Sequence, residues 1–208
     1  MKKPAESTTR TPQAHRERIL DAATQCFLEL GFERTSTAEI ASRARVSKRE
    51  LYTCFENKRD LLSNMVLNFQ DQMQSDLRKL WTSREVPERV LPKAARILQG
   101  FILSEQFGKL LRIVASESYH NPEIARQFFD LGPNRGRKTT ATYLKYQMQQ
   151  GRLKQADPIR AADDFLDLVV GAQLMTAVML GQMKDEPQRQ RRAKHAVEIF
   201  LKNYAVGH

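Results

Sequence analysis

The chain has 208 residues, of which 34 are Lys or Arg and 24 are Asp or Glu, so its formal net charge is +10. This length suffices to bury a sizeable core and favours a small domain joined to a larger one. Two cysteines exclude a disulfide scaffold, and the positive charge favours a polyanionic partner, with nucleic acid the first candidate and an anionic membrane surface the second.

Residues 1–12 combine Pro, Ser, Thr and basic residues without periodicity, which predicts a disordered basic arm. No apolar stretch follows these charges, as a secretory signal would require. The longest apolar run, from Phe165 to Gly181, is too short for a membrane span and contains Asp167 and Gln173. We therefore expect a soluble, cytoplasmic protein with no membrane partner.

The next segment has a helical pattern that ends at a glycine. Apolar residues recur at steps of three and four from Ile19 to Leu30, and Gly31 is placed to end the helix. A second, short helix is expected to open at Ser36 and to end near Ala44, because Ser36 and Glu39 have the spacing of a capping box.

Ser47 and Glu50 repeat that spacing at the start of a third short helix, and the two short helices have helix-turn-helix spacing. A helix that reads DNA is short, carries hydrogen-bond donors near its N-terminus and packs its other face on a supporting helix. Leu51 and Phe55, four residues apart, are expected to form the packed face. The residues expected on the exposed surface are Ser47, Lys48, Arg49, Tyr52 and Thr53.

A fourth helix is expected to begin near Lys58 and to run toward Trp81, which is long enough to connect two domains. Further helices are predicted at 88–104, 106–119, 122–131, 133–150, 159–180 and 189–204. No alternating strand pattern of useful length occurs. We therefore expect an all-α chain with a three-helix DNA-binding domain at 13–60 and a larger helical domain at 61–208.

Within the helix predicted at 159–180, the part from Phe165 to Leu180 is apolar on nearly every face, so it must be covered on two sides. One side can be the core of its own domain and the other a second subunit, although a fully internal helix of a monomer would satisfy the same pattern. The last helix adds a matching apolar stripe. The residues expected at a homodimer interface are Phe165, Leu168, Ala172, Met175, Met179, Val197, Phe200 and Leu201.

The middle helices carry large apolar and aromatic residues that can line a ligand cavity or form ordinary core. Glu117 and Gln173 interrupt apolar faces and can orient a polar ligand atom, although a solvent-exposed Glu117 is the simpler interpretation. The candidate ligand-binding residues are Met73, Trp81, Phe101, Phe107, Leu111, Glu117, Phe128, Tyr146 and Gln173.

The stretch Ile19 to Leu62, "ILDAATQCFLELGFERTSTAEIASRARVSKRELYTCFENKRDLL", resembles the DNA-binding domain of the TetR family of bacterial transcriptional regulators. It matches the Phe-x-x-x-Gly-Phe end of the first helix and the Val-Ser-x-x-x-Leu-Tyr-x-x-Phe-x-x-Lys-x-x-Leu-Leu pattern of the third. The segment Gln149 to Gly171 is similar to the second domain of many members. The resemblance implies a homodimer that binds a roughly two-fold operator on double-stranded DNA and releases it when a small, mainly apolar effector enters the larger domain.

Position by position, the resemblance implies DNA contacts along this stretch. Arg45 stands where the family usually has Gly, so it either bears a strain cost in a left-handed turn or adopts another turn, and its guanidinium could compensate by touching a phosphate. Cys54 stands where Tyr or His is common, which removes a phosphate contact there. The matching positions are Ser36 and Thr37 for phosphate, Lys48, Arg49, Tyr52 and Thr53 for the recognition surface, and Lys58 for the lysine that opens the fourth helix.

Three other classes of function compete with this interpretation. An enzyme has little support, because the four histidines are scattered and no metal-ligand pair, phosphate loop or nucleophile motif occurs, so neither a cofactor nor a metal is expected. A thiol-based redox regulator would act through Cys54, since Cys26 lies on the apolar face of the first helix. A basic membrane-surface protein would prefer anionic vesicles to DNA of defined sequence.

Overall fold

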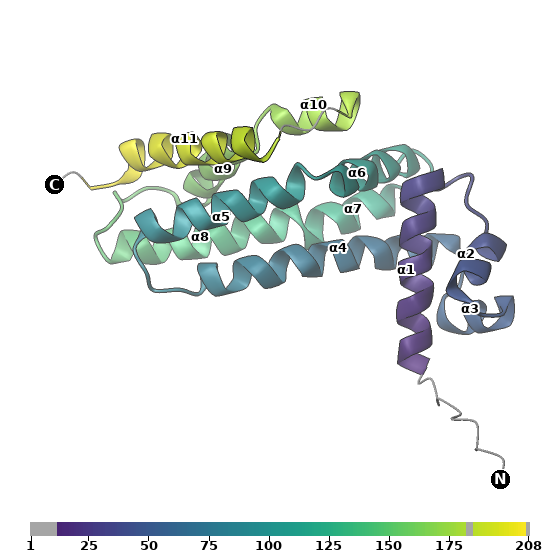
Figure 1. The fold of residues 1–208 in the computed structure, drawn as a ribbon. Coiled ribbons are helices and arrows are strands. Elements are labelled where there is room, and N and C mark those ends of the chain that lie inside the picture. Colours follow the sequence, from purple (N-terminus) through teal and green to yellow (C-terminus); the bar gives the residue numbers. More distant parts are fainter. Residues whose placement is uncertain (1–11, 182–184, 207–208) are drawn as a thin grey trace, which may run out of the picture. The chain divides into compact units, whose positions relative to one another are not determined.

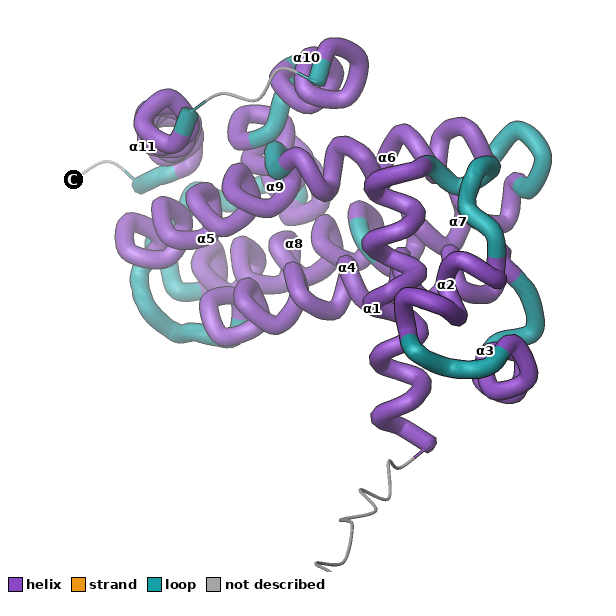
Figure 2. Tube along the Cα trace, turned by 45° about the vertical axis from the view of Figure 1, so that its right-hand side comes forward, coloured by secondary structure: helices purple, strands orange, loops and turns teal. Residues whose placement is uncertain are grey.

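A computed structural model describes residues 12–181 and 185–206, so the expected arm at 1–12 lies outside the described residues except for Pro12. Within these ranges the fold is all-α, as predicted, and the only β pairing is an isolated bridge between Leu153 and Ala205 (Figures 1 and 2). The helices are α1 (Pro12–Leu30), α2 (Thr37–Ala44), α3 (Lys48–Cys54), α4 (Lys58–Trp81), α5 (Pro87–Ile102), α6 (Glu105–Glu117), α7 (Pro122–Leu131), α8 (Pro133–Gln149), α9 (Pro158–Val169), α10 (Gln173–Leu180) and α11 (Glu186–Tyr204).

The chain divides into two compact units, Met1–Val66 and Leu67–His208. The sequence predicts a boundary at 60/61, in the first turn of α4, and the division lies further along the same helix, between Val66 and Leu67. The first two turns of α4 therefore belong to the core of the first unit, and the rest belongs to the second.

The first unit is built on the apolar face of α1. Ile19, Ala23, Cys26 and Phe27 are fully buried, and Gly31 ends the helix with a φ of 84°, as its position in the sequence predicted. Burial raises the pKa of the Cys26 thiol, so this cysteine stays protonated within the core.

The two predicted capping boxes differ. At α3, Ser47 Oγ accepts from the backbone amide of Glu50 at 3.1 Å, and the Glu50 carboxylate accepts from the Ser47 amide at 2.6 Å. The backbone amide of Ser47, followed by the Ser47 side chain, lowers the pKa of Glu50. At α2, Ser36 Oγ accepts from the Glu39 amide, but the Glu39 carboxylate accepts from Arg43 instead of reaching back. The expectation of a reciprocal box at Ser36 is thus corrected, because an arginine one turn along α2 supplies a charged partner.

The core of the second unit centres on four aromatic side chains from different helices. Trp81 of α4 lies 5.5 Å from the Tyr143 ring of α8 and 6.3 Å from the Phe165 ring of α9, and Phe165 lies 5.4 Å from Phe200 of α11. Burial raises the pKa of Tyr143, whose hydroxyl donates to the Glu85 carbonyl at 3.1 Å. These contacts hold α4, α8, α9 and α11 around one core.

The single helix predicted at 159–180 is wrong, because the structure breaks it. α9 ends at Val169, α10 begins at Gln173, and Gly171 between them has a φ of 49° (Figure 2). The Gln99 amide donates to the Val169 carbonyl at 2.7 Å, so a buried side chain of α5 satisfies a carbonyl that the broken helix leaves free.

Gly171→Ala is expected to lower the free energy of unfolding by about 1–2 kcal/mol, because a left-handed backbone is unfavourable for any residue with a Cβ. The added Cβ would also lie 3.0 Å from the Asp167 carbonyl oxygen. Gly100→Ala is the matched control: Gly100 lies inside α5 with open space at its Cβ, so this change is expected to stabilise by about 0.5–1 kcal/mol. Urea denaturation of both variants measures the change in the free energy of unfolding, which should be opposite in sign for the two. Equal stabilisation by both would show that Gly171 does not need its conformation.

Candidate functional site

The α2–α3 segment exposes cations that have no partner within the described part of the chain. Lys48 and Arg49 lie on the first turn of α3, are exposed, and make no side-chain hydrogen bond or ion pair to any described residue. Arg43 differs, because its guanidinium is held by Glu29 at 2.5 Å and Glu39 at 2.8 Å. Lys48 and Arg49 therefore remain available to an outside anion, whereas Arg43 is already paired.

Hydroxyl groups lie beside these cations. Tyr52 is 51% exposed, and its hydroxyl shares a 3.0 Å hydrogen bond with Thr37 Oγ1, which ties α3 to the start of α2. Thr53 Oγ1 donates to the Arg49 carbonyl at 2.9 Å, so its proton is used inside α3. Ser36 and Ser47 cap their helices through their Oγ atoms. All of these residues are exposed or half-buried, as a contact surface requires.

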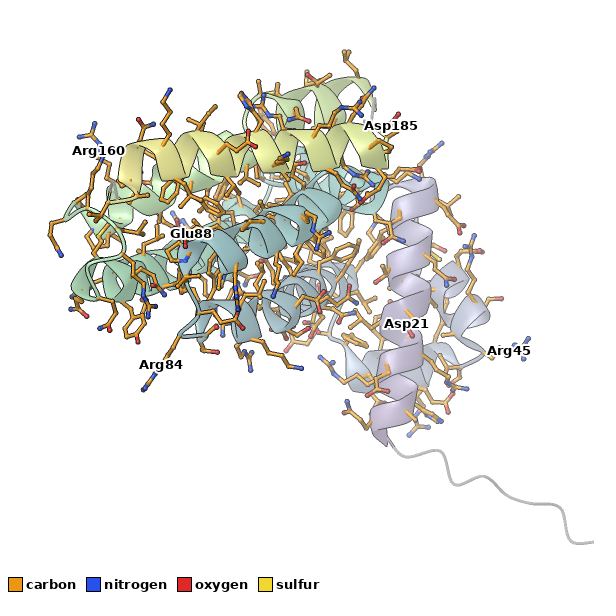
Figure 3. All side chains as sticks on the ribbon, turned by 60° about the vertical axis from the view of Figure 1, so that its left-hand side comes forward. Asp21, Arg45, Arg84, Glu88, Arg160 and Asp185 are labelled. Carbon is orange, nitrogen blue, oxygen red and sulfur yellow. The ribbon has the colours of Figure 1, made fainter. Side chains whose placement is uncertain are left out.

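Arg45 occupies the turn between α2 and α3 with φ 53° and ψ 49°. Of the two alternatives that the sequence left open, the structure has the left-handed turn. Among the described residues it is the only non-glycine with a positive φ. Its backbone amide donates to Ser42, and its side chain points away from the ribbon (Figure 3). A strained backbone that presents an exposed guanidinium is typical of a functional position.

Lys58, which the resemblance placed among the DNA-contacting positions, is held by the loop between α1 and α2. Its Nζ donates to the Phe32 carbonyl at 2.9 Å and the Thr35 carbonyl at 3.2 Å, and it lies 4.3 Å from the centroid of the Phe32 ring. The ammonium thus closes the α1–α2 loop, where three backbone carbonyls, including that of Glu33, surround it. A phosphate would have to compete with these acceptors.

Lys58→Met is expected to destabilise the first unit by about 1–3 kcal/mol, because it removes hydrogen bonds to a charged donor and a cation–π contact. Arg59→Met is the matched control, since the Arg59 side chain is exposed and has no partner among the described residues. Thermal unfolding of both variants measures the difference. If Lys58→Met left stability unchanged and reduced the salt dependence of DNA binding instead, the result would show that Lys58 contacts a phosphate.

Two buried side chains fix α3 against the rest of the first unit. Leu51 and Phe55 are almost completely buried, as their spacing predicted. The Arg16 guanidinium lies 4.8 Å from the centroid of the Phe55 ring and donates to Asn64 at 2.5 Å. The adjacent Cys54 is half-buried. α3 is therefore held rigidly while its basic turn stays exposed.

The second unit contains a cavity of about 340 Å³, which lies within the size range of small-molecule sites. Its wall is formed mainly by apolar side chains of α4, α5, α6, α7 and α9. Four of the candidate ligand-binding residues belong to the wall: Met73, Phe107, Leu111 and Phe128.

The other five candidates lie elsewhere. Trp81 packs in the aromatic core, and Phe101 does not belong to the wall but packs against one of its residues, with its ring centroid 5.4 Å from that of Phe107. Glu117, Tyr146 and Gln173 are also absent from the wall. Apolar residues at helical spacing cannot distinguish a cavity from a core, because both require an apolar face of the helix.

The polar part of the cavity wall was not predicted. Arg137 and Asp163 form a two-pronged ion pair, with Nε to Oδ1 at 2.5 Å and Nη2 to Oδ2 at 2.7 Å. Asp167 and Asn134 also belong to the wall, and Gln70 is its buried polar member. A glutamine within the apolar stripe of α4, between Phe69 and Met73, was the sequence signal that could have identified this site.

The apolar surface of α10 is the second exposed feature of this unit. Met175, Met179 and Leu180 are each about two-thirds exposed, and Ala172 is exposed beside them. The expectation that Phe165, Val197 and Phe200 touch a second subunit is corrected, because all three are buried in the core of their own chain. Leu168 is half-buried, and Leu201 packs partly against the same core.

Over the described residues, no group of three or more His, Cys, Asp or Glu side chains is arranged to hold a metal ion. In the same part of the chain, every helix is too short or too polar to cross a bilayer.

A rigid helix-turn-helix with an unpaired basic turn, followed by a helical unit with an apolar cavity, defines a DNA-binding transcriptional regulator. A family model described as "Bacterial regulatory proteins, tetR family" matches residues 19–65, and one described as "AefR-like transcriptional repressor, C-terminal domain" matches residues 89–206. The second match covers more than half of the chain. The chain therefore belongs to the TetR family, which confirms the resemblance found in Ile19–Leu62.

Solved structures agree along almost the whole length. A TetR-family regulator of Mesorhizobium loti is 25% identical with a TM-score of 0.85, over 94% of this chain and 99% of that one. The flavonoid-responsive regulator FrrA is 28% identical with a TM-score of 0.73, over 94% and 100%. SmeT of Stenotrophomonas maltophilia, solved with triclosan, is 25% identical with a TM-score of 0.72, over 93% of each chain.

Proposed function

We propose that this regulator is a repressor that binds a roughly two-fold operator as a homodimer and leaves it when a small, mainly apolar molecule enters the cavity of the second unit. The observation that carries the DNA-binding role is the pair of exposed, unpartnered cations Lys48 and Arg49 on a capped helix held from behind by Leu51 and Phe55. Arginine and lysine side chains in this position donate to guanine edges in the major groove.

The homodimer is supported by the apolar surface of α10. Met175, Met179 and Leu180 are large apolar side chains exposed close together on one helix. Exposed apolar patches of this kind commonly mark sites of protein–protein contact. A two-fold dimer brings two copies of α3 to one operator, so its half-sites repeat one helical turn of DNA apart. Ala172, Leu168 and Leu201 extend the proposed contact surface.

The release step is supported by the apolar cavity and by two relatives. FrrA is described as flavonoid-responsive, and SmeT has been solved as a complex with triclosan. A molecule in the cavity lowers operator affinity only if it binds the DNA-free conformation more tightly than the DNA-bound one. Tight binding alone is therefore no evidence for an inducer.

Selection of bound sequences from random DNA with the full chain tests the proposal. An enriched palindromic motif is expected, with half-sites spaced by one helical turn. Anionic vesicles provide the comparison: binding to vesicles without any enriched DNA motif would favour a membrane-surface protein and refute the proposal. Peroxide treatment with Cys54→Ser as a control examines the thiol-based alternative in the same assay.

A further inference from the structure

One buried acceptor in the cavity wall has no donor. Gln70 is 5% exposed, and its Nε2 donates to the Phe128 carbonyl at 3.1 Å. Because only the amide nitrogen can donate to a carbonyl, this bond fixes which end of the amide is the oxygen. The Gln70 Oε1 is buried and has no hydrogen-bond partner among the described residues. Such an atom is costly in an apolar environment unless something donates to it.

The adjacent backbone cannot supply that donor. The Gly132 amide donates to the Phe128 carbonyl at 3.1 Å, and Pro133, the next residue, has no N–H. A Cβ on Gly132 would lie 2.2 Å from the Gln70 Oε1, so the glycine makes room for the amide in this position. The geometry keeps the Gln70 amide in the wall and leaves its oxygen for a donor that comes from outside the protein.

The charged residues of the wall restrict which ligands can carry that donor into the cavity. The charged wall residues are one arginine and two aspartates, Arg137, Asp163 and Asp167, so the wall is net negative. Asp163 accepts from Arg137 Nη2 at 2.7 Å and offsets the charge of the guanidinium, so the second carboxylate of the wall, Asp167, repels a ligand carboxylate. Apart from Gln70 and Asn134, the rest of the wall is apolar and aromatic, which penalises a buried ammonium.

We propose that the effector is a compact, uncharged molecule with an aromatic or similarly apolar body and a hydroxyl group that donates to the Gln70 Oε1. This inference rests on the proposed effector role of the cavity. Its apolar body packs against Met73, Phe107 and Phe128, and the hydroxyl satisfies the one buried wall acceptor that the described residues leave unpaired.

The test compares three probes of nearly equal shape: para-tert-butylphenol, para-tert-butyltoluene and para-tert-butylbenzoate. Equilibrium dialysis against the full chain is expected to give about tenfold tighter binding for the phenol than for the toluene, since the toluene leaves the Gln70 oxygen unpaired. The benzoate is expected to bind more weakly than the phenol, because its charge must be buried beside a net negative wall.

Gln70→Met should reduce the preference for phenol over toluene to less than about twofold, because it removes the acceptor at nearly constant volume. Gln74→Met is the matched control: Gln74 lies one turn further along α4 and is 6% exposed, but does not belong to the wall. This variant should keep the tenfold preference. Gly132→Ala, which displaces the Gln70 amide without removing it, should also reduce the preference.

Equal binding of phenol and toluene to the wild-type chain would overturn the inference, as would tighter binding of the benzoate or an equal loss of preference in Gln70→Met and Gln74→Met. Failure of all three probes to bind would overturn it as well. The proposed operator binding is judged separately by selection from random DNA, which requires no effector. If para-tert-butyltoluene bound the protein and released the operator as well as the phenol does, the proposed function would stand and the role of Gln70 would be refuted.

Discussion

Met175→Glu combined with Met179→Glu is expected to convert the proposed dimer into a monomer and to weaken operator binding by more than about a hundredfold, the gain that two linked half-sites give. Met175 and Met179 are 66% and 71% exposed on α10, and burying each in an interface contributes about 1.5–3 kcal/mol. In a two-fold interface each change occurs twice, so four carboxylates would have to lose their water together.

Light scattering gives the mass, and a gel-shift titration with the selected operator gives the affinity. Tyr119→Glu is the matched control, because Tyr119 is 86% exposed but lies outside α10, just after the end of α6. This variant should remain dimeric and bind normally. A double methionine variant that keeps the dimer mass would show that α10 is not the contact surface, and a wild-type chain that is monomeric at micromolar concentration would rule out the dimer itself.

The helices of the first unit could be predicted from the sequence because their signals are local. Ser47 and Glu50 complete a capping box within four residues, and Gly31 supplies the left-handed end of α1. The break between α9 and α10 is different. Its apolar pattern continues through Gly171, and a lone glycine is tolerated inside helices at a cost of about 1 kcal/mol. The bond from Gln99, seventy residues earlier, helps to stabilise the break, and no local pattern contains it.

The candidate site also divides into residues that local signals predict and residues whose contacts are long-range. Lys48 and Arg49 were predicted to be exposed because they follow the cap of a short amphipathic helix, and their exposure is confirmed. The contacts of Lys58 are with carbonyls of a loop more than twenty residues away, so no local pattern indicates them, and the resemblance placed this residue among the DNA contacts instead. Phe165 and Phe200 show the limit for apolar residues: their spacing predicts burial, but not whether the burying partner is the same chain or another.

Lys48→Ala and Arg49→Ala address the recognition surface directly. A contact to a base edge is worth roughly 1–3 kcal/mol, so each variant that loses one should bind the selected operator about 5- to 150-fold more weakly at fixed salt. The preference at one position of each half-site should relax at the same time, because that position is no longer read. A cation that touches only phosphate behaves differently: its loss weakens all sequences alike and lowers the salt slope by about one per contact.

Arg43→Ala provides the internal comparison, since Arg43 is a cation of the same segment that Glu29 and Glu39 already hold. We expect it to leave the base preferences unchanged. The measurement is a salt series of affinities for the selected operator and its single-base variants. Should Lys48→Ala and Arg49→Ala both retain the wild-type affinity and preferences, α3 would not be the element that reads DNA. Its exposed cations would then be ordinary solvated charges. No second pair of unpartnered basic side chains at the start of a capped helix would replace them, because the described part of the first unit has none.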